Sequence, residues 1–196
     1  MRSGLRCNPR RSHGSERGRT HSQQTTYDRA TMTRSITTPL PDPDHVAVAE
    51  FWRSVTEKGL APVGSPTPQA DYFGDSVELA DDLLALIIDG PKRATASSYD
   101  ELVREGEPIP QVGDLWITLD GRGVPRALLR TTDVRIGPLS SVDDAFAWDE
   151  GEGDRTRDDW LAEHTRFFSR WLPQVGLEFH PDMATVFERF ELVHSE

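Results

Sequence analysis

The stretch FGDSVELADDLLALIIDGPKRATASS, residues 73–98, contains a helix, a stop signal and a strand in direct succession. Ser76 is a good N-cap, and apolar residues recur behind it at helical spacing: Leu79, Ala80, Leu83, Leu84, Leu86 and Ile87. Gly90 suits the position just past a helix end, and Pro91 prevents the helix from continuing. The small residues of 94–98 then predict a short strand.

Two further helices are predicted on either side of this stretch. Asp44 caps a helix that ends at Gly59, and its buried face carries Val48, Phe51, Trp52 and Val55. Thr156 and Asp159 have the spacing of a capping box. They open a helix whose apolar face carries Trp160, His164, Phe167, Phe168 and Trp171. Because His164 lies on that apolar face, we interpret it as a hydrogen-bonded core residue and not as a ligand or base.

The other segments have the texture of strands and loops. Residues 115–119 (LWITL) are followed by Asp120-Gly121, a strong hairpin signal, and 125–134 would be the partner strand. Residues 184–193 (ATVFERFELV) predict a closing strand, and the Pro- and Gly-rich stretch 61–74 predicts a loop. Few strands among scattered helices indicate an α+β fold with a small, mostly antiparallel sheet or barrel, not a parallel doubly wound sheet.

Length and composition exclude several classes of protein. A chain of 196 residues suffices for one ordinary domain, and no apolar run is long enough for a membrane span. The single cysteine, Cys7, cannot form an intrachain disulfide, which favours a cytoplasmic protein, and no Cys/His spacing suggests zinc. The net charge of −11 argues against tight, nonspecific binding to duplex DNA.

The charge is distributed unevenly along the chain. Residues 1–34 carry eight arginines against two acidic residues and almost no large apolar side chains, so we predict a disordered basic segment. It could be a nucleic-acid-binding arm, a targeting segment, or sequence upstream of a translation start at Met32. Residues 35–196, predicted as a single domain, hold 14 basic and 31 acidic residues, a net charge of −17.

Two segments could carry chemistry, although no familiar catalytic signature is present. The first runs from Gly90 to Ser97 (GPKRATAS), with a lysine and a threonine three residues apart at the junction of a helix and a strand. The second, EGEGD (150–154), places carboxylates between flexible glycines just before the third helix. Each pattern alone is typical of a solvated surface. Residue spacing by itself therefore predicts only a globular α+β domain with a polar cleft, and no specific activity.

From about residue 71 to 193, however, the chain resembles the ASCH domain family, which has a PUA-like small β-barrel flanked by helices. Gly90, Lys92 and Thr95 match the family's Gly-x-Lys-x-x-Thr motif, while Ser97 stands where many members have arginine. Further matching segments are Pro-x-Val-Gly-Asp (110–114), AWDEGEGDRTRDDWLAEHTRFF (147–168) and ERFELV (188–193). The acidic segment followed by Trp and His-x-x-Phe-Phe is similar to a branch of small, stand-alone bacterial members.

The resemblance implies that RNA, or a modified nucleoside or nucleotide, binds in a cleft near this motif, with no cofactor, no metal and no membrane. The ligand-binding residues would be Gly90, Arg93, Ser97, Glu150 and Asp154. As an alternative, a related branch hydrolyses the acetyl amide of N4-acetylcytidine with a lysine, a threonine and a glutamate. These would be Lys92, Thr95 and Glu152, with Glu150 as the alternate glutamate. A metal-independent ribonuclease that uses Lys92 as a cation near the phosphate is a further alternative.

The net charge of residues 35–196 is the sequence feature that best distinguishes nucleoside hydrolysis from RNA binding. A neutral acetylated nucleoside needs no basic surface, whereas RNA binding at a net charge of −17 requires basic side chains to gather on one face. The residues available for such a face are Arg93, Arg126, Arg130 and Arg135. One dimension of sequence does not show whether they gather, and it predicts no oligomeric state.

Overall fold

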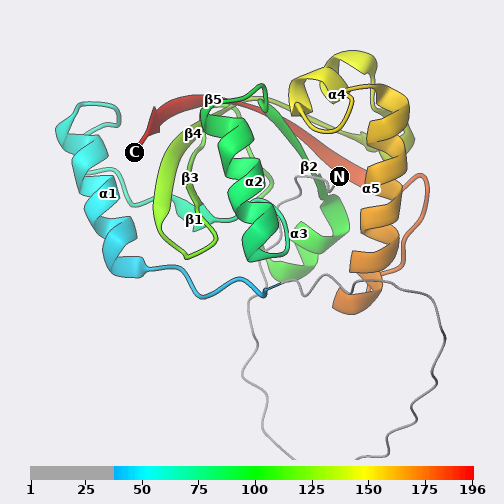
Figure 1. The fold of residues 1–196 in the computed structure, drawn as a ribbon, viewed down its shortest axis with the longest axis horizontal. Helices are drawn as coiled ribbons and strands as arrows, with labels where there is room; N and C mark the ends of the chain where they lie inside the picture. Colours follow the sequence, from blue (N-terminus) through cyan, green and yellow to red (C-terminus); the bar gives the residue numbers. More distant parts are fainter. Residues whose placement is uncertain (1–37) are drawn as a thin grey trace, which may run out of the picture.

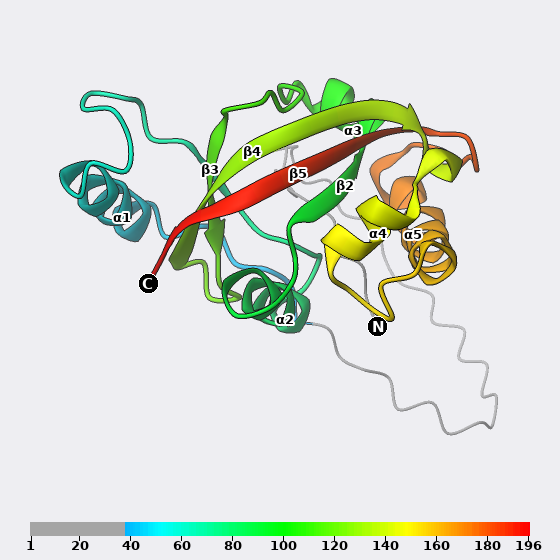
Figure 2. The same ribbon diagram turned by 90° about the horizontal axis from the view of Figure 1, so that it is seen from above.

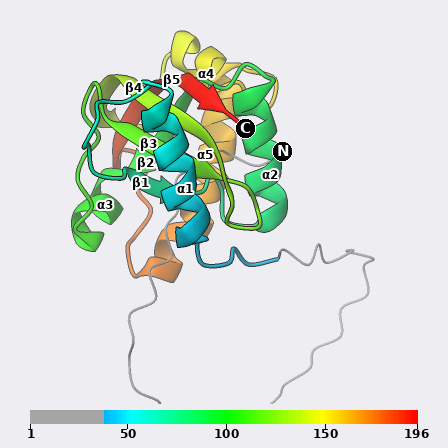
Figure 3. The same ribbon diagram turned by 90° about the vertical axis from the view of Figure 1, so that its left-hand side faces the viewer.

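The computed structural model describes residues 38–196, and the predicted basic segment 1–34 lies outside the described residues. Figure 1 shows a curved sheet in the middle of the molecule, with α1 (His45–Glu57) at one end. The helices α4 (Asp144–Glu150) and α5 (Arg157–Trp171) lie at the other end, and α2 (Val77–Ile88) crosses the sheet between them. Viewed from its left-hand side, the molecule shows α1 nearest the viewer with the sheet behind it (Figure 3).

Five strands form the sheet in the order β1 (Gln69–Asp71), β3 (Leu115–Leu119), β4 (Pro125–Pro138), β5 (Ala184–Ser195) and β2 (Ala94–Ser98). β1 is parallel to β3, and the other pairs are antiparallel. The long strands β4 and β5 run side by side across the molecule (Figure 2). Register shifts between Leu128 and Leu129 and between Thr131 and Asp133 interrupt their ladder. β1 and β2 form the two edges of a half-barrel, so the predicted α+β class with a mostly antiparallel sheet is confirmed.

The predicted helices begin where their caps place them. The side chains of Asp44 and Ser76 accept hydrogen bonds from the first backbone N–H groups of α1 and α2. Thr156 does the same for α5 by accepting from the backbone N–H of Asp159. The other half of the expected capping box is wrong, because Asp154, and not Asp159, accepts the bond from the Thr156 N–H, at 2.8 Å.

The hairpin between β3 and β4 is present, but its turn differs from the expected two-residue type. The loop spans Asp120 to Val124, and the Asp120 carboxylate accepts hydrogen bonds from the backbone N–H groups of Arg122 and Val124. Gly123, and not Gly121, takes the left-handed conformation, with φ +83°. The aspartate thus organises a wider loop than the dipeptide signal predicts.

Two short α-helices, one short strand and two 3₁₀-helices (Leu139–Ser141 and Leu172–Val175) were not predicted from the sequence. α3 (Tyr99–Glu105) follows β2 directly with Ser98 as its N-cap, and α4 begins after the N-cap Asp143. Both helices have only seven residues, which is too few to show a hydrophobic period. β1 lies within the stretch 61–74 that we expected to be a loop, and it exists as a strand because it pairs with β3.

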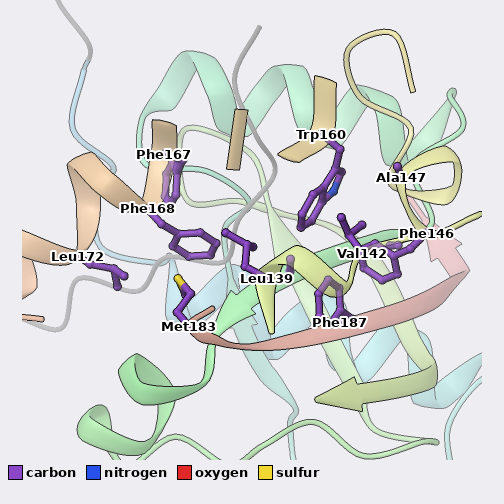
Figure 4. Packing of buried hydrophobic residues seen from close by; sticks show 12 residues of the cluster. Leu139, Val142, Phe146, Ala147, Trp160, Phe167, Phe168, Leu172, Met183 and Phe187 are labelled. Carbon is purple, nitrogen blue, oxygen red and sulfur yellow. The ribbon is translucent and has the colours of Figure 1, made fainter. Parts of the chain in front are cut away.

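The core consists of buried apolar clusters under α1, under α2, and between the sheet and the α4–α5 pair. Figure 4 shows the last of these, in which Phe187 of β5 meets Phe146 of α4 and Trp160 of α5. The ring centroids of Phe187 and Phe146 are 5.1 Å apart in an edge-on arrangement, and those of Phe187 and Trp160 are 6.0 Å apart. This packing fixes the first turns of α4 and α5 against β5.

Candidate functional site

The two segments that the sequence singled out lie against each other. The backbone N–H of Arg93 donates a 2.7 Å hydrogen bond to the carbonyl of Asp149. Gly151 has φ +73°, and a Cβ added there would lie 2.7 Å from the backbone nitrogen of Lys92. Only glycine combines this conformation with so close an approach. The acidic loop after α4 is therefore held directly on the loop that leads into β2.

Lys92 lies at the centre of this contact, and its side chain has no exposed surface. The ammonium donates hydrogen bonds to the backbone oxygen of Ala94, at 3.0 Å, and to Glu152 Oε1, at 2.5 Å. Glu150 Oε1 is 4.0 Å away, and the Phe73 ring centroid is 5.4 Å from Nζ. The lysine is thus removed from water and held by one carboxylate in direct contact.

The two glutamates of the acidic loop both reach this lysine. Glu150, the last residue of α4, is fully buried, and within residues 38–196 neither of its carboxylate oxygens has a hydrogen-bond partner. Glu152 is 12% exposed, and its Oε2 also lacks a partner in that range. Burial raises the pKa of Glu152, and the neighbouring Lys92 opposes part of that rise. Glu152 therefore accepts the direct hydrogen bond from the Lys92 ammonium, whereas Glu150 is 4.0 Å from the ammonium and forms no such bond.

His164 of α5 also contacts this group of side chains, which comprises Lys92, Glu150 and Glu152. As expected, it is buried and hydrogen bonded, since Nδ1 lies 3.0 Å from the backbone oxygen of Trp160. Its ring stacks on the Trp160 indole with 3.6 Å between centroids. The sequence did not indicate that its other nitrogen, Nε2, would face Glu150 Oε1 at 3.4 Å. The histidine therefore packs in the core and also contacts the candidate site.

Thr95 is fully buried in β2, directly opposite Glu188 of β5. Paired residues of antiparallel strands project from the same face, so the two side chains are neighbours. Glu188 is also buried, and it accepts a 2.6 Å hydrogen bond from the Thr131 hydroxyl. Glu188 and Thr131 were not among the residues predicted from the sequence, although a charged residue inside the closing strand ERFELV was a usable signal. Ser97, two residues further along β2, is buried opposite Val186.

Other residues expected to bind a ligand have partners within the protein. The Arg93 guanidinium donates to the backbone oxygens of Ile87 and Lys92, at the end of α2. Asp154 is exposed and accepts two hydrogen bonds from Thr156, which lower the pKa of its carboxyl. Gly90 does not take a left-handed conformation. It leaves room for the helix instead, because a Cβ there would lie 2.9 Å from the backbone oxygen of Leu86.

Three of the four arginines considered for RNA binding have intramolecular partners, two of them at the protein surface. Besides Arg93, Arg130 pairs with Glu191 at 2.7 Å. Arg135 donates to the Ser141 hydroxyl at 2.8 Å and lies over the Phe187 ring, 4.0 Å from its centroid. These guanidiniums form hydrogen bonds, an ion pair and a ring contact within the protein. Each of these contacts would have to be given up or shared for the arginine to bind a phosphate.

Residues 38–196 contain neither a metal-binding cluster nor a membrane-spanning helix. No group of three histidine, cysteine or carboxylate side chains in this range is arranged to hold a metal ion. Within the same range, no helix combines the length and the apolar character needed to cross a bilayer.

The chain is similar to proteins of one family. The sequence profile of the ASCH domain matches residues 69–194. The crystal structure of protein EF3133 from Enterococcus faecalis V583 is 38% identical, covers 75% of this chain and 88% of that chain, and superposes with a TM-score of 0.69. The crystal structure of an ASCH domain from Lactobacillus crispatus JV V101 is 34% identical, covers 76% and 89% of the two chains, and gives a TM-score of 0.61. No curated protein matches significantly.

These matches cover the sheet and the helices that surround the candidate site. The chain belongs to the ASCH domain family. Its fold is the PUA-like α+β half-barrel that the resemblance implied.

Proposed function

We propose that this protein is an amidohydrolase that removes the acetyl group from N4-acetylcytidine or a related N4-acylated cytosine nucleoside. Lys92, Thr95 and Glu152 would carry the chemistry. The observation that supports this proposal best is the fully buried Lys92 ammonium, hydrogen bonded to Glu152 where the two motif segments meet. A charged pair is expensive to remove from water, so its presence in a family motif favours a chemical role over a structural one.

The choice of lysine at this position supports the same function. The chain has 22 basic residues, of which only Lys58 and Lys92 are lysines. An arginine could pair with Glu152 equally well, but its guanidinium does not give up a proton in proteins. A lysine in a water-poor site can act as a proton acceptor and donor. The residue type therefore fits proton transfer better than simple charge pairing.

The reaction can be written with these groups alone. Movement of one proton from the Lys92 ammonium to Glu152 leaves a neutral amine. The amine takes the proton of the Thr95 hydroxyl as its oxygen attacks the acyl carbon, and Glu152 returns its proton to the departing N4 amine. Water then cleaves the acyl–threonine ester: Glu152 accepts the proton of the attacking water, and Lys92 reprotonates the Thr95 oxygen. The proton held by Glu152 then returns to the Lys92 amine, which restores the starting ion pair. The products are the free nucleoside and acetic acid, which ionises to acetate in water.

RNA binding, which the family resemblance also suggests, has less support from the site. Lys92 has no exposed surface to offer a phosphate, and three of the four candidate arginines bond within the protein. The net charge of −17 over residues 35–196 repels a polyanion. A neutral nucleoside does not meet this charge repulsion, whereas the buried Lys92 and Thr95 must become accessible to either kind of ligand.

The test is acetate release from N4-acetylcytidine by the full chain, beside Lys92→Arg. The arginine of this variant keeps the positive charge but cannot release a proton. We therefore expect turnover to fall about 10²- to 10⁴-fold. Lys58→Arg is the matched control, because Lys58 is exposed and pairs with Glu196, and its turnover should stay unchanged. Full activity in Lys92→Arg would refute the assigned role. Absence of wild-type turnover, together with salt-sensitive binding or shortening of single-stranded RNA, would replace the proposal with the RNA alternatives.

A further inference from the structure

Glu150 is a buried carboxylate without a cation in direct contact. Its side chain has no exposed surface, and neither oxygen accepts a hydrogen bond within the described part of the chain. The Lys92 ammonium is 4.0 Å away and is already bonded to Glu152. A carboxylate buried in this way is costly unless a proton or a positive charge neutralises it. The nearest group that could do so is the His164 ring, 3.4 Å from Oε1.

The hydrogen bonding of His164 indicates where its protons must lie. Nδ1 is 3.0 Å from the backbone oxygen of Trp160, and a carbonyl only accepts hydrogen bonds, so Nδ1 carries hydrogen. In a neutral ring, Nε2 would then present a lone pair to the Glu150 carboxylate, and two acceptors would face each other. Neither His164 Nε2 nor Glu150 Oε1 has a hydrogen-bond partner among the residues that the structure describes. One additional proton on Nε2 turns this repulsive contact into an N–H···O⁻ interaction.

The aromatic neighbour of the ring can stabilise a positive charge on it. The imidazole stacks on Trp160 with 3.6 Å between centroids and 15° between planes, and the face of an indole attracts a cation. The titratable groups that face His164 are Glu150 at the end of α4, Glu152 in the following loop, and Lys92 ahead of β2. With both Lys92 and His164 charged, the cluster of four side chains holds two positive and two negative charges and is neutral as a whole.

We propose that His164 is held as an imidazolium paired with Glu150, and that it acts as a positioning residue for Lys92. An ionised Glu150 without its own partner would add a second negative charge 4.0 Å from the Lys92 ammonium and would oppose proton release. His164 cancels that charge, so that only Glu152 competes for the lysine proton. This role in the reaction rests on the proposed amidohydrolase function, whereas the charge state of His164 does not.

Nitrogen NMR of the full-length protein tests the charge state without any substrate. Long-range ¹H–¹⁵N spectra at about pH 7.5 should show both His164 nitrogens protonated, although a histidine in water is mostly neutral there. In Glu150→Gln, Nε2 should lose its proton while Nδ1 keeps its own. His180, which is exposed, is the internal reference and should be identical in both proteins. A neutral His164 ring in the wild type, or a ring unchanged in Glu150→Gln, would overturn the proposal.

A double-variant cycle tests the positioning role. We expect His164→Gln to lower kcat about tenfold more in the wild-type background than in the Glu150→Gln background, because the second background has no charge left to cancel. Equal losses in both backgrounds would show that His164 only packs, and would refute its action through Glu150. If the wild type has no turnover, the amidohydrolase proposal fails while the NMR result still decides the charge state.

Discussion

The two lysines of this protein form the same kind of ion pair in opposite surroundings. Lys58 pairs with Glu196 at 3.1 Å, and both side chains are nearly half exposed. Lys92 pairs with Glu152 at 2.5 Å, with no exposed surface on the lysine and 12% exposure on the glutamate. Water screens the first pair, so it contributes little to stability and nothing to chemistry. The second pair is enclosed with a second glutamate and a histidine, where a proton can be exchanged.

The largest effect should come from breaking the buried pair. Lys92→Met keeps the length of the side chain but leaves Glu150 and Glu152 without the ammonium, so the free energy of unfolding should fall by about 3–5 kcal/mol. Urea unfolding followed by tryptophan fluorescence measures this loss. The double variant Lys92→Met/Glu152→Leu should recover part of it, because one stranded carboxylate is removed. A double variant no more stable than the single one would contradict the assignment of the loss to that carboxylate.

A buried carboxylate with a neutral partner provides an intermediate case. Glu101 of α3 accepts a 2.6 Å hydrogen bond from the Trp171 indole, and burial raises its pKa from the ordinary 4.5 to about 7. Between these values the folded protein keeps a proton that the unfolded chain has lost. The free energy of unfolding therefore decreases as pH rises through this range.

Replacing this carboxyl should remove that pH dependence. Wild type should lose about 2 kcal/mol between pH values of about 5 and 8, and Glu101→Gln should lose much less, since glutamine still accepts from Trp171 without ionising. Urea titrations at both pH values measure the difference. Glu178→Gln, at an exposed position, is the matched control and should follow the wild type. Equal slopes in wild type and Glu101→Gln would exclude Glu101 as the source.

The closeness of the two motif segments can be tested with a pair of glycines. Gly151 and Gly59 have nearly the same φ, +73° and +72°, but a Cβ at Gly151 would meet the Lys92 backbone, whereas nothing lies within 4 Å at Gly59. Alanine should cost about 1 kcal/mol at Gly59 from conformation alone. At Gly151 it should cost about 2 kcal/mol more, because the loops must separate. Equal losses in urea unfolding would show that the close approach contributes nothing.

The smallest effect should come from the exposed pair. Lys58→Met should change the free energy of unfolding by less than about 1 kcal/mol, and added salt should reduce that change further. Lys58 also holds the pKa of Glu196 below its ordinary value, so this small contribution should disappear as Glu196 is protonated at low pH. Urea unfolding at low and high salt measures the change. A loss as large as that of Lys92→Met would remove the contrast between the two lysines.

The local features of the fold were readable from the sequence because their causes lie within a few residues. Asp44, Ser76 and Thr156 cap the helices that the apolar spacing predicted. The β3–β4 hairpin follows from two strand-like segments and a turn signal between them. The family motif also identified Lys92 and the acidic loop as a candidate site before any contact between them was known.

Only the tertiary structure decided how these pieces meet, because such contacts depend on packing and register across long stretches of chain. β1 is a strand only through its pairing with β3, and Thr95 faces Glu188 only in the observed register of β2 and β5. His164 had the spacing of a core residue, and spacing does not reveal that its free nitrogen meets Glu150. The sequence determined the three long helices, four of the five strands and the reactive residue types. The burial of Lys92 among two glutamates and a histidine depends on the packing of α4 and α5 against the start of β2, which only the tertiary structure shows.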